Sequence, residues 1–340
     1  MDLIPQEAEL SSKTAKKATI FQAGEDFLET VRLARSPHTA RTYANALNKF
    51  YEVLDSKDLP HRSASVGELT EDAIAWFASA LKNYSPATES LYLTVGARFY
   101  EYLAAERLSS PNLPRLRLLI RQRARRPGQR LPQFPKNDIE IVTDYVNNLT
   151  YSSAESANER LRVLRDRSFL LTLCDTGLRV QEACSLRRGD LDWNEQKAII
   201  TGKGNRQAVV RFSNRSIAAL RTYLNARALL DGASGRPLAS LPLFARHDKG
   251  AGKKIKPITT ATGRNIVKQR VVEALEKPSS GSITPHSFRH YFVTRILVAS
   301  GGNLKLAQEL ARHRNIAVTQ RYAHLSDDEL DRGYYNAFEN

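Results

Sequence analysis

The sequence predicts a mainly α-helical protein with one small antiparallel β-sheet, organised as two folded domains. Three observations predict it: 340 residues suffice for two domains, helical periodicity dominates, and two short β-rich runs flank a glycine-containing turn. Hydrophobic residues make up 41% of the chain and charged residues 26%, which is enough apolar material for a folded core. No apolar run approaches the ~18–20 residues that span a bilayer, and the N-terminus lacks the apolar stretch of a secretory signal. We therefore expect no membrane segment and a cytoplasmic protein.

Residues 1–20 are polar and aperiodic, so we expect a flexible N-terminal arm. Residues 21–110 show helical spacing and no strand pattern, which predicts an all-helical domain. A short amphipathic turn pair is expected first, around Phe27. Ser36 and Ser85 each precede a proline, and serine as N-cap with proline in the first turn is typical of helix starts. A further helix is expected to open in the segment that follows Leu69.

Residues 111–136 are expected to form a basic linker between the domains. Prolines recur along this stretch and should interrupt helices. Between Pro114 and Arg130 there are seven arginines and no acid, a one-signed pattern that favours contact with a phosphate backbone. The arginines are Arg115, Arg117, Arg121, Arg123, Arg125, Arg126 and Arg130.

Residues 137–325 carry a mixed pattern that predicts a second, α+β domain. The β-rich runs 197–201 and 207–212 flank a Gly-Lys-Gly-Asn turn, which predicts a hairpin with Lys203 at its tip. A lysine there is either a solvated turn residue or a side chain that the hairpin inserts into a DNA groove. We expect 231–257 to be a long loop. Helices are expected near 138–149, 160–175, 214–230, 261–276, 286–300, 303–312 and 315–323.

The chain has 51 Lys+Arg against 36 Asp+Glu, a formal net charge of +15. Such an excess predicts a polyanionic partner such as nucleic acid, but it does not separate an enzyme from a passive binder. The two cysteines, Cys174 and Cys184, are too few for a four-ligand zinc site, and we expect reduced, buried thiols.

Two pairs of polar residues fall on shared helical faces. Glu182 stands three residues after Arg179, where its carboxylate can hold the guanidinium or make an ordinary helix ion pair. Thr284 and a following proline open a helix that carries His286 and Arg289 on one face. A helix N-terminus with these side chains suits an oxyanion, although a capping histidine and a surface arginine fit equally well.

His313 ends one helix, and Tyr322 follows on the next. Taken together with Arg179, Lys203, His286 and Arg289, in this order, they resemble the tyrosine recombinase (phage integrase) family. The matching segments are TGLRVQE, TGKGNR, HSFRH, and LARH nine residues before Tyr322. The resemblance spans about 137–335, and the helical domain is similar to the family's core-binding domain. It implies a two-domain DNA clamp. Arg312 stands where the family usually has glycine, and Phe288 where leucine is more usual.

The resemblance implies a division of labour in the site. Arg179 and Arg289 would clamp the scissile phosphate, and Tyr322 would attack it to give a 3′-phosphotyrosyl link and a free 5′-hydroxyl. Lys203 would be the general acid, and His286 and His313 would supply hydrogen bonds and proton transfer. Glu182 would orient the site. Two arginines can stabilise the charge without a metal, and the sequence has no carboxylate cluster of a two-metal nuclease. We therefore expect no metal, no cofactor and no ATP.

The implied partners are double-stranded DNA with a specific recombination site and three further copies of the chain, a homotetramer on two duplexes. Strand exchange would pass through a Holliday junction, in a nucleoid-associated, Xer-like recombinase. Residues 326–340 are acidic and are expected to contact a neighbouring protomer. The role is dimer resolution, transposition or integration. The alternatives are a type IB topoisomerase-like enzyme that only relaxes DNA, and a non-catalytic DNA-binding protein of the same fold.

Overall fold

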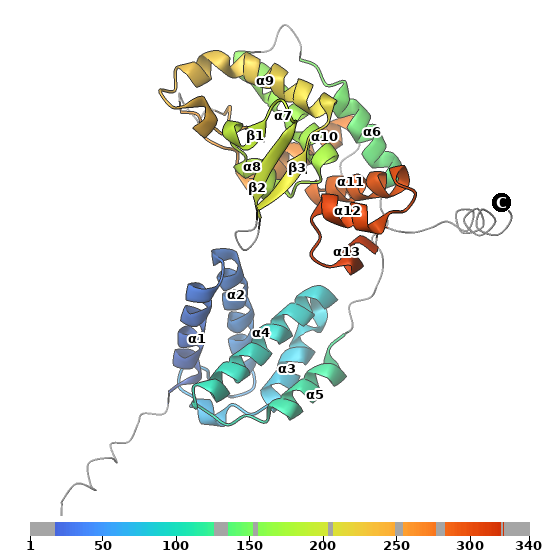
Figure 1. Ribbon diagram of the computed structural model, residues 1–340. Coiled ribbons are helices and arrows are strands. Elements are labelled where there is room, and N and C mark those ends of the chain that lie inside the picture. The colour runs from blue at the N-terminus through green and yellow to red at the C-terminus, as the bar shows by residue number, and fades with distance from the viewer. Residues whose placement is uncertain are drawn as a thin grey trace, which may run out of the picture. The chain divides into compact units, whose positions relative to one another are not determined.

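The computed structural model describes residues 18–125, 135–151, 156–202, 207–248, 254–276, 283–320 and 322. Lys203, Arg126, Arg130, residues 1–17 of the expected arm and the 326–340 tail lie outside the described residues. The chain divides into two units, Met1–Arg130 and Leu131–Asn340 (Figure 1). The predicted fold class, mainly α with one small antiparallel sheet, is confirmed.

Helices alone build the described part of the first unit, as the sequence predicts. Ser36 and Ser85 cap α2 and α4, and each side-chain oxygen accepts a backbone N–H at the third helical position. The core gathers aromatic side chains from α2, α3 and α4, with Phe50 and Phe77 at a ring-centroid distance of 5.0 Å. The elements are α1 (Ile20–Ala34), α2 (Pro37–Asp55), α3 (Asp72–Ala80), α4 (Pro86–Ala105) and α5 (Leu113–Arg123), with 3-10 turns at Val66–Glu68 and Leu81–Asn83.

The first helix is longer than the turn pair that the sequence predicts. It begins at Ile20, because Thr19 and Gln22 form a capping box in which each side chain binds the other's backbone N–H, at 3.2 and 3.1 Å. Helix α1 therefore starts at the last residue of the expected 1–20 arm. Phe27 is buried, whereas Leu33, one of the apolar residues of this segment, is 83% exposed.

The expected linker is wrong for residues 113–123, which form helix α5 of the first unit. Pro114 lies in the first turn of α5, where a missing N–H costs nothing, so it starts the helix instead of breaking it. Asn112 caps the helix, and Leu116 is buried in the helical core. Residues 126–134 lie outside the described residues.

The second unit is centred on α7 (Ala157–Thr176), which packs against α6 (Lys136–Asn147), α8 (Val180–Ser185), α9 (Asn214–Gly232) and α11 (Pro285–Ala299). Thirteen of the twenty residues of α7 are buried, and they include charged side chains such as Arg165 and Asp166, which pair with each other. Helices α11, α12 (Leu304–Ala311) and α13 (Ile316–Gln320), orange to red in Figure 1, pack on one another in turn. The remaining helix is α10 (Thr260–Leu275).

The sheet has the order β1–β2–β3 and is antiparallel throughout. Its strands are β1 (Leu191–Asp192), β2 (Lys197–Thr201) and β3 (Gln207–Arg211). The predicted hairpin strands are confirmed, with Thr201 opposite Gln207 at the end of the ladder. The sequence missed β1, because two residues are too few to show an alternating pattern.

The expected long loop at 231–257 is wrong in part. Helix α9 extends through Gly232, a 3-10 turn follows at Leu238–Ser240, and Leu241, Leu243 and Phe244 are fully buried. Apolar side chains on irregular backbone carry no periodicity, so their burial could not be read from the sequence.

Candidate functional site

The site begins at the sharp turn between α7 and α8. Gly177 ends α7 with φ +59°, and a Cβ there would lie 2.4 Å from Cδ1 of Phe292 on α11. Only glycine fits both the left-handed backbone and this close approach. The turn brings Arg179 to the N-cap of α8 and turns the carbonyl of Gly177 toward α11 and α12.

Arg179 and Glu182 form the ion pair that their spacing predicts. Nη1 of Arg179 donates to Oε1 of Glu182 at 2.8 Å, and the backbone N–H of Arg179 donates to Oε2 at 2.9 Å. Their side chains are 54% and 10% exposed, so the arginine faces solvent while the carboxylate does not. Burial opposes ionisation of Glu182, but the hydrogen bonds from Arg179 and the charge of Arg312 outweigh it and lower its pKa.

Helix α11 presents the second pair of predicted residues. Thr284 and Pro285 start the helix as expected, and the N–H of Thr284 donates to Oγ of Ser287 at 3.0 Å. Arg289 is only 2% exposed and donates from Nη1 to the carbonyl of Gly177 and from Nη2 to that of Ala311. Arg289 therefore ties the α7–α8 turn to the end of α12. Burial, with the charge of Arg179, lowers its pKa to about 10.

The two predicted histidines differ in exposure but share a direction of pKa shift. His286 is exposed at the start of α11, and desolvation and the charges of Arg289 and Arg179 lower its pKa. His313 is buried, and its Nδ1 lies 2.8 Å from Oγ1 of Thr319. Burial and the same two arginines lower its pKa to about 4. Both imidazoles are therefore neutral near pH 7, and a neutral ring can both accept and donate a proton.

Tyr322 lies beside two histidine rings. Its ring centroid is 6.0 Å from that of His313, nearly parallel at 14°, and 4.3 Å from that of His290, edge-on at 69°. The tyrosine also packs against the apolar cluster of α11 and α12, and it interacts electrostatically with Arg289. The structure thus brings Arg179, His286, Arg289, His313 and Tyr322 to one place, although 143 residues separate the first from the last.

Sequence reasoning gave no role to two residues that the structure adds to the site. His290 stands in the HSFRH segment, and its ring meets Tyr322. Arg312 contacts Glu182 and the carbonyl of Gly177 from its Nη2, at 3.3 and 3.4 Å. The sequence contained an indication that Arg312 is unusual, since it occupies the position where the resembled family usually has glycine.

The arginines of the expected linker are not a free row of charge. Arg115 pairs with Glu71 at 3.0 Å and Asp72 at 2.7 Å. Arg117 pairs with Glu101 at 3.2 Å, and Arg125 with Glu89 at 2.5 Å. A one-signed stretch of sequence acquires its counter-ions from other helices in the fold. Arg121 and Arg123 are exposed, and in the described part of the chain they make no ion pair.

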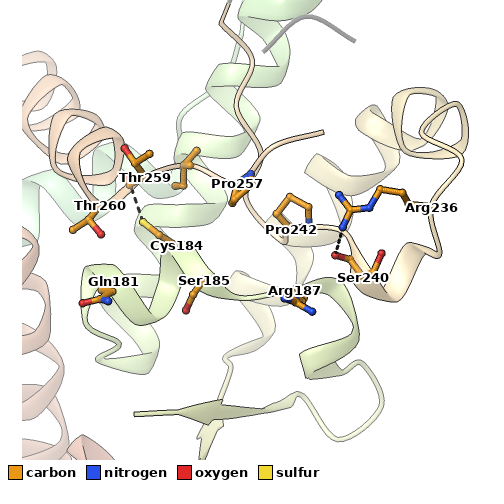
Figure 2. Close-up of a pocket in the computed structure, with 11 residues that line it drawn as sticks. Gln181, Cys184, Ser185, Arg187, Arg236, Ser240, Pro242, Pro257, Thr259 and Thr260 are labelled. Carbon is orange, nitrogen blue, oxygen red and sulfur yellow. Dashed lines mark hydrogen bonds between the residues drawn. The ribbon is translucent and has the colours of Figure 1, made fainter. Parts of the chain in front are cut away.

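A separate pocket of about 540 Å³ lies beside α8 (Figure 2). Gln181, Cys184 and Ser185 of α8 face Thr259 and Thr260 at the start of α10 across it. None of the predicted site residues that the structure describes lines this pocket. Cys184 and Cys174 are both buried free thiols, as expected, and burial raises each pKa to about 12.

Among the described residues, no helix has both the length and the apolar character to cross a membrane. The same residues contain no group of three or more His, Cys, Asp and Glu side chains placed to bind a metal ion.

Known proteins resemble this chain in sequence. The Phage integrase family profile matches residues 147–329. A tyrosine recombinase XerC of Bacillus pumilus is 32% identical over 238 residues, 69% of this chain and 70% of that relative. A tyrosine recombinase XerC of Alcanivorax borkumensis is 29% identical over 303 residues, 89% of this chain and 88% of that relative.

Solved structures share the fold. XerH site-specific recombinase bound to its palindromic difH substrate superposes with a TM-score of 0.66 at 18% identity, covering 93% of this chain and 84% of that one. A lambda integrase dimer bound to a COC′ core site gives a TM-score of 0.61 at 14% identity, covering 90% and 96%. Fold and site together define an enzyme that breaks and rejoins DNA strands. The chain belongs to the phage integrase family and is a tyrosine site-specific recombinase.

Proposed function

We propose that Tyr322 is the nucleophile of a metal-free and ATP-free DNA strand transfer. Its phenolic oxygen forms a bond to the scissile phosphorus as the bond to the 5′ oxygen breaks, which leaves a 3′-phosphotyrosyl link and a 5′-hydroxyl. The link conserves the energy of the phosphodiester, so resealing needs no nucleotide hydrolysis. The observation that carries the proposal is the convergence of Tyr322, two neutral histidines and several guanidinium groups around a single described carboxylate, Glu182.

Arg179 and Arg289 would stabilise the charge that develops on the non-bridging phosphate oxygens. Bidentate guanidinium contacts suit a phosphorane, and donors fixed in advance need no reorganisation during the reaction. Arg289 is held by two carbonyls, which supports a fixed orientation. Arg179 is exposed enough to reach a bound strand.

Proton transfer would be shared between lysine and histidine. His313, with a pKa of about 4, is neutral and can accept the proton of Tyr322. His286, exposed at the helix start, would donate a hydrogen bond to the phosphate. Lys203, outside the described residues, would protonate the departing 5′ oxygen, a role that rests on the family resemblance. Glu182 would orient the site by accepting the backbone N–H of Arg179 at 2.9 Å, a contact that does not depend on where the guanidinium points.

The same chemistry exchanges strands when the attacking 5′-hydroxyl comes from a second duplex. We propose a homotetramer on two duplexes that works through a Holliday junction, with the two units as a clamp and residues 326–340 contacting a neighbouring protomer. The relatives named XerC and the neighbour XerH bound to difH support an Xer-like role at a specific site, in the cytoplasm on the nucleoid. Dimer resolution, transposition and integration all use this reaction.

A nicked suicide duplex tests the proposal, because a short 5′-hydroxyl fragment diffuses away after cleavage and traps the covalent adduct. The duplex carries the site found by footprinting the protein on DNA flanking its own coding sequence. We expect a denaturant-stable adduct with the wild type and none with Tyr322→Phe, which should still bind the duplex. An adduct that survives Tyr322→Phe would remove Tyr322 from the mechanism.

A second duplex in the same reaction separates the rival activities. Recombinant junctions, sequenced from the products, support strand exchange. Relaxation of a supercoiled plasmid without any exchange between duplexes would instead identify a topoisomerase-like enzyme. Binding without an adduct would identify a non-catalytic DNA-binding protein.

A further inference from the structure

Arg312 has an unusual backbone for an arginine. It is the C-cap of α12, with φ +59° and ψ +42°, the left-handed region that glycine enters without strain. A residue with a Cβ is strained in this region. The strain gives the position a local preference for glycine, so any contribution of this side chain must come from the contacts that its guanidinium makes.

That guanidinium lies inside the site. The side chain is 12% exposed, and Nη2 contacts Oε2 of Glu182 at 3.3 Å and the carbonyl of Gly177 at 3.4 Å. Nε and Nη1 are buried and have no hydrogen-bond partner among the described residues. The ion pair with Glu182 is therefore the contact through which the positive charge of Arg312 can act.

Glu182 serves two arginines at once. Arg179 reaches its carboxylate from the same helix, and Arg312 reaches Oε2 from the end of α12. If Arg179 turns its side chain onto a phosphate, Glu182 loses that partner while it stays only 10% exposed. A buried carboxylate left without a counter-ion is strongly destabilising, and this penalty would oppose the movement of Arg179 onto the DNA.

We propose that Arg312 is a positioning residue that keeps Glu182 neutralised while Arg179 binds the scissile phosphate. The inference rests on the proposed function, since it assigns Arg179 to the phosphate. Arg312 acts through Glu182 and touches no DNA. It lowers the free energy needed to exchange the Arg179–Glu182 ion pair for an Arg179–phosphate contact.

Arg312→Gly tests the proposal without disturbing the fold, because glycine prefers the left-handed backbone. We expect the rate of adduct formation on the nicked duplex, at saturating protein, to fall at least tenfold, while thermal stability is equal or higher. Arg107→Gly is the matched control. Arg107 also has a left-handed backbone, with φ +56°, and is exposed in the first unit, so its rate should stay within twofold of the wild type.

The charge state of Glu182 supplies a readout that a merely structural role would not move. In a Glu182→Gln background no carboxylate needs a counter-ion, so adding Arg312→Gly should change the adduct rate by less than twofold. Arg312→Lys keeps the positive charge and should retain at least a third of the wild-type rate. Losses that multiply in the double variant, or an Arg312→Lys variant as slow as Arg312→Gly, would overturn the proposal.

The outcomes also distinguish a failure of this inference from a failure of the proposed function. If the wild type forms no adduct on a site that it binds, the proposed function fails. If the wild type forms the adduct, Tyr322→Phe does not, and Arg312→Gly keeps the wild-type rate, only the role of Arg312 fails.

Discussion

Arginines meet carboxylates in different proportions on α5 of the first unit and at the α7–α8 turn of the second. On α5, Arg115 has two carboxylate partners, Glu71 and Asp72. At the turn, Arg179 and Arg312 share Glu182, and Arg289 binds carbonyls instead. The charge of Arg115 is neutralised within the fold, whereas the three guanidinium groups at the turn keep an excess that an anion can satisfy.

The difference shows that the density of arginines along a sequence does not locate an anion site. The stretch from Pro114 to Arg130 is the most basic part of the chain, yet helix packing gives three of its arginines acidic partners. The guanidinium groups at the α7–α8 turn come from three separate segments, which carry Arg179, Arg289 and Arg312. Their excess of positive charge at one place exists only after folding.

The largest effect is expected where a buried guanidinium has no carboxylate of its own. Arg289→Lys should slow adduct formation about 100-fold or more, because one ammonium cannot serve two carbonyls and a phosphate together. The measurement is the single-turnover rate on the nicked duplex. Arg98→Lys, at an exposed ion pair with Glu101 on α4, is the control and should stay within threefold. An equal loss of adduct-formation rate in the two variants would contradict the expected difference between the buried Arg289 and the ion-paired Arg98.

A buried carboxylate of the first unit should affect stability and leave the chemistry unchanged. Glu89 is 0% exposed and accepts hydrogen bonds from Lys82 at 2.8 Å and from the backbone N–H of Arg125 at 3.0 Å. Glu89→Gln should reduce the free energy of unfolding of this unit by about 1–3 kcal/mol at pH 7. Urea unfolding in a Trp193→Phe background measures it, since Trp76 then reports the first unit alone.

The pH dependence of this effect follows from the pKa of Glu89. Burial opposes its ionisation, but the hydrogen bonds of Lys82 and Arg125 outweigh burial and lower the pKa to about 2, from 4.5 in the unfolded chain. The stabilisation is therefore present above pH 4.5 and is lost as the pH falls toward 2. The stabilities of the wild type and Glu89→Gln should approach each other as the pH falls below 4.5 and should converge only near pH 2. Glu52→Gln, at an exposed pair with Lys49, should change stability by less than about 0.5 kcal/mol at either pH.

The smallest effect distinguishes arginines within the same helix. Arg121 and Arg123 are exposed on α5, and we expect them to contact the DNA backbone, whereas Arg115 and Arg117 are held by carboxylates. Changing the first pair to glutamine should reduce the slope of log K against log salt by about 2, because two phosphate contacts are lost. Changing the second pair should reduce it by less than about 0.5. Fluorescence anisotropy between 50 and 300 mM salt measures both slopes, and identical slopes would contradict the assignment.

Much of the fold followed from local sequence signals. The serine–proline starts of α2 and α4 and the paired strands of the hairpin depend on neighbouring residues, so they could be predicted and are confirmed. Helix α5 could not be predicted, because a proline such as Pro114 indicates the interruption of a helix unless the position of the helix start is known. The burial of Leu243 and Phe244 also depends on which elements cover them.

The candidate site, like the fold, has features that local sequence predicts and features that depend on tertiary contacts. Arg179, Glu182, His286, Arg289, His313 and Tyr322 each stand in a local context that the sequence displays, at the start of a helix, at its end or just beyond it. The sequence by itself therefore singled out the residues that we propose carry the chemistry, and it predicted a polyanionic partner. It also determined the class of fold, because periodicity and capping are short-range properties.

Only the tertiary structure decided how these residues share charge. Arg312 and Glu182 are 130 residues apart, and nothing in either local sequence indicates that the guanidinium meets the carboxylate at 3.3 Å. Arg115, in the most basic segment of the chain, likewise finds Glu71 and Asp72 only when α5 packs on α3. The physical reason is that ion pairing depends on distance and burial in space, and both arise from contacts between segments remote in sequence.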